Sequence, residues 1–252
     1  MQILNKERPV DSLPAISIVA INDLGGRVLL TLDGGNERFC GMRVSRRDDH
    51  EMFREQVRRF VEREVAPHHA QWEADGIVPR DVWLKAGRAG LLCCLIPEEY
   101  GGAGGDFGHS AVIIEEMARV NASAFGLTTH SEICAPYILR YGTETQKRRW
   151  LTGMSSGETI CAIAMTEPGC GSDLRSLRTS AVRDGDHYIV NGQKTFISNG
   201  VNADLVIVAV KVEPRPSEKK ITLLLVDTSS PGFSKGKKLG KVGLRGRHEL
   251  VG

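Results

Sequence analysis

Residues 157–165 read GETICAIAM, and the spacing of apolar residues changes there from helical to strand-like. Before this stretch, apolar residues recur every three or four positions, as on one face of a helix. After it, short apolar runs are separated by two-residue turn signals, as in antiparallel strands. The sequence predicts an α+β protein, with an α-helical domain over residues 48–158 and a small antiparallel β-barrel or sandwich domain over residues 159–252.

Helices are predicted throughout residues 48–158. The first carries apolar residues at helical spacing from Phe53 to Val65, and Pro67 then ends it. Thr143 and Gln146 have the spacing of a capping box, which predicts the start of a later helix. Further helices are expected from about Asp81 to Gly90, along the stripe Ile113, Ile114, Met117 and Ala118, and after Pro136.

Short strands are predicted from residue 159 onward. Asp184-Gly185 and Asn191-Gly192 are turn signals between strand-like segments, which indicates successive hairpins. A charged stretch with two prolines, Pro214 to Lys220, is expected to be a surface loop. Residues 1–47 have apolar runs broken by glycines, and we expect an atypical, loosely folded or disordered extension there. The remaining strands are expected at Thr195–Ser198, Leu205–Val210 and Ile221–Val226.

Composition and charge exclude several classes of function. The chain of 252 residues has a formal net charge of +2, which is too small to indicate capture of nucleic acid or of an anionic membrane. No apolar run approaches the roughly 18 residues that cross a bilayer. The start of the chain lacks a secretory pattern, and its acidic residues are unlike a transit peptide. We therefore expect no nucleic-acid partner and no membrane span.

Cysteines and histidines show no metal-binding pattern. The six cysteines include no C-x-x-C spacing and mostly have apolar neighbours, so reduced thiols in the core are expected. This applies also to the adjacent pair Cys93 and Cys94. His68, His69 and the other histidines are not grouped like metal ligands along the sequence. No metal site is expected.

A hydroxyl-bearing turn follows the first buried strand, where residues 165–173 read MTEPGCGSD. Gly169 and Gly171 allow main-chain N–H groups to approach a ligand closely. The hydroxyls of Thr166 and Ser172 can donate or accept hydrogen bonds. The alternative is a plain turn, in which Ser172 and Asp173 cap the next short helix.

A second segment, NGQKTFISNG at residues 191–200, places an aromatic ring and a hydroxyl on one strand. Alternation along the strand puts Phe196 and Ser198 on the same face. The ring can pack on a flat heterocycle and the hydroxyl can reach an edge nitrogen, so the pair suits a planar cofactor. An ordinary hairpin strand is the alternative.

In this order, the two segments resemble the signature of the acyl-CoA dehydrogenase family. The resemblance runs from about Asp48 to Leu244 and includes PEEYGG at residues 97–102, YGT at 141–143 and PGF at 231–233. It is closest to the long-chain type, through the general run of PHH at residues 67–69 and HS at 130–131.

The resemblance implies an N-terminal helical domain, a middle β-barrel domain and a C-terminal four-helix domain, of which only the first two are present. It also implies FAD at their junction and between subunits of a homo-oligomer, with Thr166 bonded to the flavin ring and Ser198 directed toward flavin N5. The expected flavin contacts are Ile163, Ala164, Met165, Thr166, Gly171, Ser172, Phe196, Ile197 and Ser198; the expected acyl-CoA contacts are Ser172, Glu218 and Lys219.

The family removes two hydrogens across the α and β carbons of an acyl-CoA thioester, as in fatty acid β-oxidation, and the flavin receives the hydride. The family's base is a Glu of the C-terminal domain, so no catalytic residue is expected in this chain. Residues 245–252 read RGRHELVG and depart from the family pattern, which suggests a truncation or a shifted reading frame that leaves the barrel incomplete.

Three functions remain open on the sequence. The first is an FAD-dependent acyl-CoA dehydrogenase that passes electrons to an acceptor such as electron-transfer flavoprotein. The second is a catalytically inactive fragment that binds FAD or acyl-CoA. The third is an acyl-CoA oxidase, which passes electrons to oxygen. A bacterial cytoplasmic location is expected, with the mitochondrial matrix as the alternative.

Overall fold

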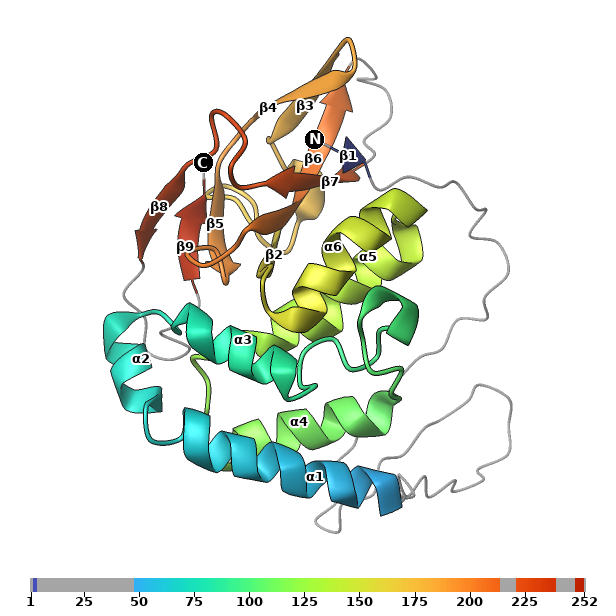
Figure 1. Cartoon of the computed structure of the whole chain (residues 1–252). Helices are drawn as coiled ribbons and strands as arrows, with labels where there is room; N and C mark the ends of the chain where they lie inside the picture. Colours follow the sequence, from blue (N-terminus) through green and yellow to red (C-terminus); the bar gives the residue numbers. More distant parts are fainter. Residues whose placement is uncertain (1, 4–47, 214–220, 239–247, 252) are drawn as a thin grey trace, which may run out of the picture.

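Helices and strands occupy separate parts of the molecule. A computed structural model describes residues 2–3, 48–213, 221–238 and 248–251. The helices up to residue 156 lie together, and the strands lie beside them with α5 and α6 nearest (Figure 1). This arrangement confirms the predicted α+β class. Among the described residues, no helix is both long and apolar enough to cross a membrane.

The described residues of the helical part form six α-helices. The capping box at Thr143 is confirmed, because its hydroxyl accepts from the N–H of Gln146 while the Gln146 side chain accepts from the N–H of Thr143. A π-helical turn, Val61–Val65, prolongs the first helix as far as the sequence predicts. The helices are α1 (Asp48–Phe60), α2 (His69–Asp75), α3 (Arg80–Arg88), α4 (Phe107–Arg119), α5 (Ala135–Tyr141) and α6 (Glu144–Ser156).

Two details of the helices differ from the prediction. Helix α2 was not predicted, because only Trp72 of its seven residues is buried and so its sequence carries no apolar stripe. Ile114 and Ala118 were placed on the apolar stripe of α4, but both are exposed, Ile114 to 41%. Ile113, the neighbour of Ile114, faces the core instead, since consecutive helical residues point about 100° apart.

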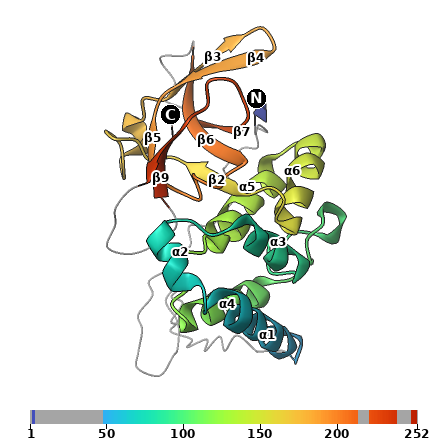
Figure 2. The same ribbon diagram turned by 60° about the vertical axis from the view of Figure 1, so that its left-hand side comes forward.

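A buried carboxylate joins α1 to α4, which lie side by side at the end of the molecule away from the strands (Figure 2). The Glu116 side chain is 2% exposed and accepts hydrogen bonds from Arg58 at 2.9 and 3.0 Å, Arg54 at 3.1 Å and Arg119 at 3.0 Å. These bonds, Arg58's first among them, lower the pKa of Glu116 to about 2. The carboxylate therefore stays charged and paired at neutral pH.

The strands form two sheets. The larger has the order β1-β7-β6-β3-β4, with β2 also paired to β6, and the smaller has the order β5-β9-β8. The strands are β1 (Gln2–Ile3), β2 (Cys161–Ala164), β3 (Ser180–Asp184), β4 (His187–Asn191), β5 (Lys194–Ser198), β6 (Leu205–Glu213), β7 (Ile221–Asp227), β8 (Lys235–Lys238) and β9 (His248–Val251).

The pairing is mixed rather than wholly antiparallel, which corrects the prediction. Strands β2 and β3 both run parallel to β6. Parallel neighbours need a long crossover, and the chain from β2 to β6 supplies one because it contains a loop and three strands. Among the described residues the strand order is not closed into a barrel.

The two turn signals have different outcomes. Asp184-Gly185 lies in the predicted hairpin, since β3 and β4 pair from Asp184 and His187 onward. Asn191-Gly192 does not make a hairpin, because β5 pairs with β9 instead of β4. A Cβ at Gly192 would collide with the Thr179 side chain, so the glycine permits a close crossing of two chain segments there.

Cysteines lie in the core as predicted. Cys93, Cys94, Cys134, Cys161 and Cys170 are free and buried. Burial raises the pKa of the Cys94 thiol to about 11 and raises that of Cys93 further. Both thiols are therefore protonated and unreactive at neutral pH. Cys40, the predicted loop at 214–220 and most of the N-terminal extension lie outside the described residues.

Candidate cofactor site at the junction of the helices and the sheets

A buried histidine, His130, joins the helical part to strand β2. His130 is fully buried, and its Nδ1 accepts from the N–H of Cys161 at 3.1 Å. Its other nitrogen must then carry the proton, and it donates to the carbonyl of Met154 at 3.0 Å. Burial lowers the pKa of His130 to about 4. A neutral ring therefore fixes the start of β2 against α6.

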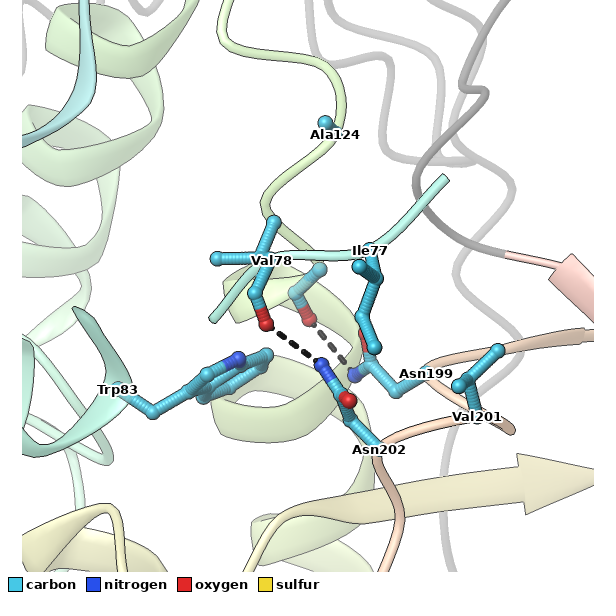
Figure 3. A pocket seen from close by; sticks show the side chains of 8 residues that line it. Ile77, Val78, Trp83, Ala124, Asn199, Val201 and Asn202 are labelled. Atoms are coloured by element: carbon cyan, nitrogen blue, oxygen red, sulfur yellow. Dashed lines mark hydrogen bonds between the residues drawn. The ribbon is translucent and has the colours of Figure 1, made fainter. Parts of the chain in front are cut away.

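Two asparagines make further hydrogen bonds across the junction (Figure 3). Asn199 donates to the carbonyls of Gly126 at 3.0 Å and Cys161 at 3.3 Å, and Asn202 donates to that of Val78 at 2.7 Å. The pocket beside them has room for about 10 Å³, which holds no more than a water molecule. Around Asn199 and Asn202 the two parts therefore form a packed joint, and the pocket there is too small for a cofactor.

Gly126 is the tightest point of the joint, and we expect its replacement by alanine to destabilise the chain. A Cβ at residue 126 would collide with the Asn199 side-chain amide. Overpacking of this kind costs about 1–3 kcal/mol, which urea denaturation measures. Gly169→Ala is the matched control, because a Cβ there meets no atom among the described residues. Equal effects of the two variants would contradict a constrained joint.

The glycine-rich loop follows β2 directly, where the sequence places it. Glu167 and Cys170 exchange two backbone hydrogen bonds of 2.8 and 3.1 Å, which fold residues 167–170 into a tight turn. Asp173 then caps the short helix Leu174–Ser176 by accepting from the N–H of Arg175 at 3.2 Å. Gly171 and Ser172, between these two structures, are exposed.

An ion pair inside the fold fastens this loop to β5. The Lys194 ammonium lies 2.9 Å from the Glu167 carboxylate and donates to the carbonyl of Met165 at 3.0 Å. Next to it, the N–H of Thr195 donates to the carbonyl of Thr166 at 2.9 Å. The two segments singled out in the sequence are thus brought together by the residues at 165–167 and 194–195.

Electrostatics and hydrogen bonding keep Glu167 ionised. Burial alone would raise its pKa, but bonds from Thr179, from the N–H of Arg178 at 2.7 Å and from Lys194 lower it to about 2. Burial is the largest influence on Lys194 and lowers its pKa, although Glu167 opposes the shift. The side chains are only 5% and 4% exposed, so each charge depends on the other.

The predicted contact residues have different exposures. Ala164 and Ile197 are buried and pack in one hydrophobic cluster. Phe196 is 58% exposed. Glu218 and Lys219 lie outside the described residues. Of the rest, Gly171 and Ser172 are exposed, and Ile163, Met165, Thr166 and Ser198 are partly buried.

Phe196 has a backbone conformation unusual for its type. Its φ is 58°, in the left-handed region, and the register of β5 with β9 shifts between Lys194 and Ile197. A bulky residue in this region costs of order 1–3 kcal/mol, and such outliers concentrate at functional sites. Phe196 is exposed, Ile197 is buried and Ser198 is partly buried; the shared face of Phe196 and Ser198 stays a prediction.

A larger cavity lies beside β4. Its volume is about 540 Å³, in the range of small-molecule sites. It adjoins the loop anchors, since Ala164, Thr179 and Lys194 form part of its wall. Apolar side chains from β6, β7 and the segment after β7, namely Val208, Val226 and Phe233, complete that wall.

Sequence reasoning missed the two residues that hold the site together. Glu167 and Lys194 were read within their segments but given no role. The signal available was one charge close to a strand in each segment: Glu167 follows the apolar residues 160–165 and Thr166, and Lys194 opens the strand-like stretch KTFIS at residues 194–198. Neither signal identifies the other residue as its partner, because the two lie 27 positions apart.

Comparison with known proteins agrees with this architecture. Residues 47–158 match the profile described as acyl-CoA dehydrogenase, N-terminal domain, and residues 162–251 match the middle domain. The long-chain specific acyl-CoA dehydrogenase of Sus scrofa mitochondria is 46% identical over 224 residues, covering 84% of this chain and 52% of that protein. The chain spans about half the length of the curated relatives it matches.

Solved structures give the same result. The crystal structure of an acyl-CoA dehydrogenase from Geobacillus kaustophilus has a TM-score of 0.79 and 50% identity, covering 81% of this chain and 55% of that one. A glutaryl-CoA dehydrogenase from Mycobacterium smegmatis, solved in complex with FADH2, has a TM-score of 0.74 and 29% identity, covering 81% and 52%.

Fold and site together define a two-part α+β chain in which a glycine-rich loop and an aromatic-bearing strand meet beside the junction of the parts. The two domain matches and the similar proteins show which family this chain belongs to. The chain belongs to the acyl-CoA dehydrogenase family, of which it carries the N-terminal and middle domains.

Proposed function

We propose that this chain supplies the flavin-binding part of an FAD-dependent dehydrogenase that introduces an α,β double bond into acyl-CoA thioesters. The observation that carries the proposal is the junction of the two segments, in which the N–H of Thr195 bonds to the carbonyl of Thr166 beside the Lys194–Glu167 pair. This bond joins Thr166 of one segment to Thr195 of the other, the residue that precedes the exposed Phe196.

The residues present fit a flat, polar-edged cofactor. A Cβ at Gly169 or Gly171 would meet no described atom, and neither has a left-handed φ, so packing and backbone do not require glycine there. Close approach of a ligand to the main chain does account for both glycines. Phe196 offers an exposed ring, and its strained backbone is consistent with a functional constraint.

When bound, FAD would supply the acceptor for the hydride from the substrate's β carbon, and this chain would bind and orient it. Thr166 and Ser198 would hydrogen-bond the flavin ring, Phe196 would pack against the cofactor, and Ser172 would contact the acyl-CoA. The further contacts proposed are Ile163, Ala164, Met165, Gly171 and Ile197 for FAD, with Glu218 and Lys219 for acyl-CoA. Abstraction of the α proton is assigned to a carboxylate outside residues 1–252.

The same proposal covers the domain boundary, which lies near residue 158, and the assembly of the enzyme into a homo-oligomer. It also covers the substrates, which are long-chain acyl-CoA thioesters, and the electron acceptor, which is an electron-transfer flavoprotein. A cytoplasmic location is proposed, with the mitochondrial matrix as the alternative, since the relative from Sus scrofa is mitochondrial.

Two matched phenylalanines test the flavin site. Phe196→Ala should weaken FAD binding roughly three- to tenfold, because an aromatic contact contributes about 0.5–1.5 kcal/mol. Phe107, on α4, is 69% exposed, so Phe107→Ala is the control and should leave FAD binding unchanged. Flavin fluorescence measures both affinities. Equal losses, or no binding of FAD by the chain, would contradict the proposal.

The absence of a base for abstraction of the α proton is tested on the same chain after FAD has been added. An acyl-CoA added without oxygen should leave the flavin absorbance unchanged, because no residue here is assigned as the base. Bleaching would contradict that assignment and would also exclude an inactive fragment. Peroxide production in air, following such bleaching, would favour an oxidase.

A further inference from the structure

One carboxylate joins the glycine-rich loop to two other segments of the chain. The Glu167 side chain accepts from the N–H groups of Arg178 at 2.7 Å and Thr179 at 2.9 Å, which follow the short helix after the loop. The Thr179 hydroxyl also donates to Glu167, and the Lys194 ammonium of β5 lies 2.9 Å from it. These four residues, called the Glu167 cluster below, therefore hold the loop at a single point.

The Glu167 cluster fixes the main chain on both sides of Thr166. Before Thr166, the carbonyl of Met165 accepts from the Lys194 ammonium at 3.0 Å, and after it comes Glu167 itself. The carbonyl of Thr166 accepts from the N–H of Thr195 at 2.9 Å. The N–H and the hydroxyl of Thr166 make no hydrogen bond with another described residue. Two donors thus remain available at a residue whose position is fixed.

Apolar packing already attaches the loop to the sheet, so attachment alone does not account for the charges. Cys170, Leu177 and Ala209 form a buried cluster, and Met165 and Leu174 pack against it. A buried ion pair often contributes no more net stability than apolar residues of similar volume. A carboxylate with several donors does impose direction, because hydrogen bonds weaken steeply away from their preferred angles.

We propose that Glu167 is a positioning residue for the cofactor, which together with Lys194 holds Thr166 so that its N–H and hydroxyl donate to the flavin ring. This inference rests on the proposed function. The Glu167 and Lys194 side chains are 5% and 4% exposed, so they act through Thr166 and not by binding the flavin. A small displacement of a positioned donor is enough to weaken its bond, as in other sites that depend on orientation.

Glu167→Gln tests this inference in the whole chain. The substitution keeps the size of the side chain but removes its charge, so Lys194 loses its ionic partner. FAD binding should weaken about tenfold, the effect of misaligning one or two hydrogen bonds. The visible absorption bands of the bound flavin should also move toward those of free FAD, because the ring loses donors. Flavin fluorescence measures the affinity, and absorption at saturating FAD measures the bands.

Glu116→Gln is the matched control for a purely structural effect. The Glu116 side chain is likewise buried, has its pKa lowered to about 2 and accepts from charged partners, but it lies in the contact of α1 with α4, away from the strands (Figure 2). It should lower the free energy of unfolding in urea by an amount comparable to Glu167→Gln. The affinity for FAD and the flavin bands should stay as in the unaltered chain.

Two milder variants keep the test informative if Glu167→Gln fails to fold. Thr179→Val removes one donor to Glu167 and should weaken FAD binding by about two- to fivefold, the effect of part of a hydrogen bond. Lys194→Arg keeps the charge beside Glu167 and should bind FAD more tightly than Lys194→Met.

The outcomes separate this inference from the function on which it rests. Absence of FAD binding by the unaltered chain would overturn both. If the unaltered chain binds FAD, then equal affinities in Glu167→Gln, Thr179→Val and Glu116→Gln would overturn the positioning role alone.

Discussion

Replacing Lys194 by methionine should destabilise the chain by about 3–5 kcal/mol, the usual cost of leaving one partner of a buried ion pair alone. Glu167 would remain in the fold without its ammonium partner, and the carbonyl of Met165 would lose its donor. Since Lys194 also lies next to the Thr195–Thr166 bond, the loop should separate from β5. Urea denaturation at pH 7 measures the change in the free energy of unfolding.

Two further variants show whether the loss of stability comes from the buried ion pair. Lys194→Arg keeps the charge and should recover a large part of the lost stability. Lys211→Met removes a lysine whose ammonium bonds to the Arg175 carbonyl at 2.8 Å in an exposed position, so it should cost less than 1 kcal/mol. Equal costs for Lys194→Met and Lys211→Met would show that the buried pair does not stabilise the loop.

The second large effect concerns pH and His130. Its pKa is lowered from 6.5 to about 4 in the folded chain. Below about pH 6.5 the unfolded chain binds a proton at this residue while the folded chain does not, so stability falls as pH falls from 6.5 toward 4. At roughly 1.4 kcal/mol per pH unit, the full loss is about 3 kcal/mol.

Nitrogen NMR measures this residue directly. The His130 ring should stay neutral, with its proton on Nε2, until the pH approaches 4, because Nδ1 accepts from Cys161. His130→Gln removes the titrating group, so the fall in stability between pH 6.5 and pH 4.5 should become shallower. Titration of the wild-type ring near pH 6.5 would contradict this account.

The sequence alone predicted correctly the elements that depend on interactions between neighbouring residues. The capping box at Thr143 and the hairpin at Asp184-Gly185 each depend on a few neighbouring residues, and both were predicted correctly. Helix α2 was missed because its contacts with the core pass through one side chain, Trp72. Nothing in its own spacing of apolar residues indicates a helix.

Features that depend on distant partners could not be predicted. Asn191-Gly192 has the local chemistry of a hairpin turn, yet tertiary pairing assigns β5 to β9. The loop and strand of the cofactor site were found from their own residues, whereas the Glu167–Lys194 pair between them required the fold. The same holds for Glu116 and its partners Arg54 and Arg58, which only the contact of α1 with α4 brings together.

Strand β2 sets the distance between the joint at His130 and the glycine-rich loop at residues 165–173. Its start is held by His130 and its end leads into the loop at 165–173, so four residues rising about 13 Å separate the joint from the loop. A single residue inserted into β2 would displace the loop by about 3.3 Å and reverse the faces of the side chains that follow it in the strand. We expect length changes to be tolerated at the exposed Gly185 turn and rejected between Cys161 and Ala164.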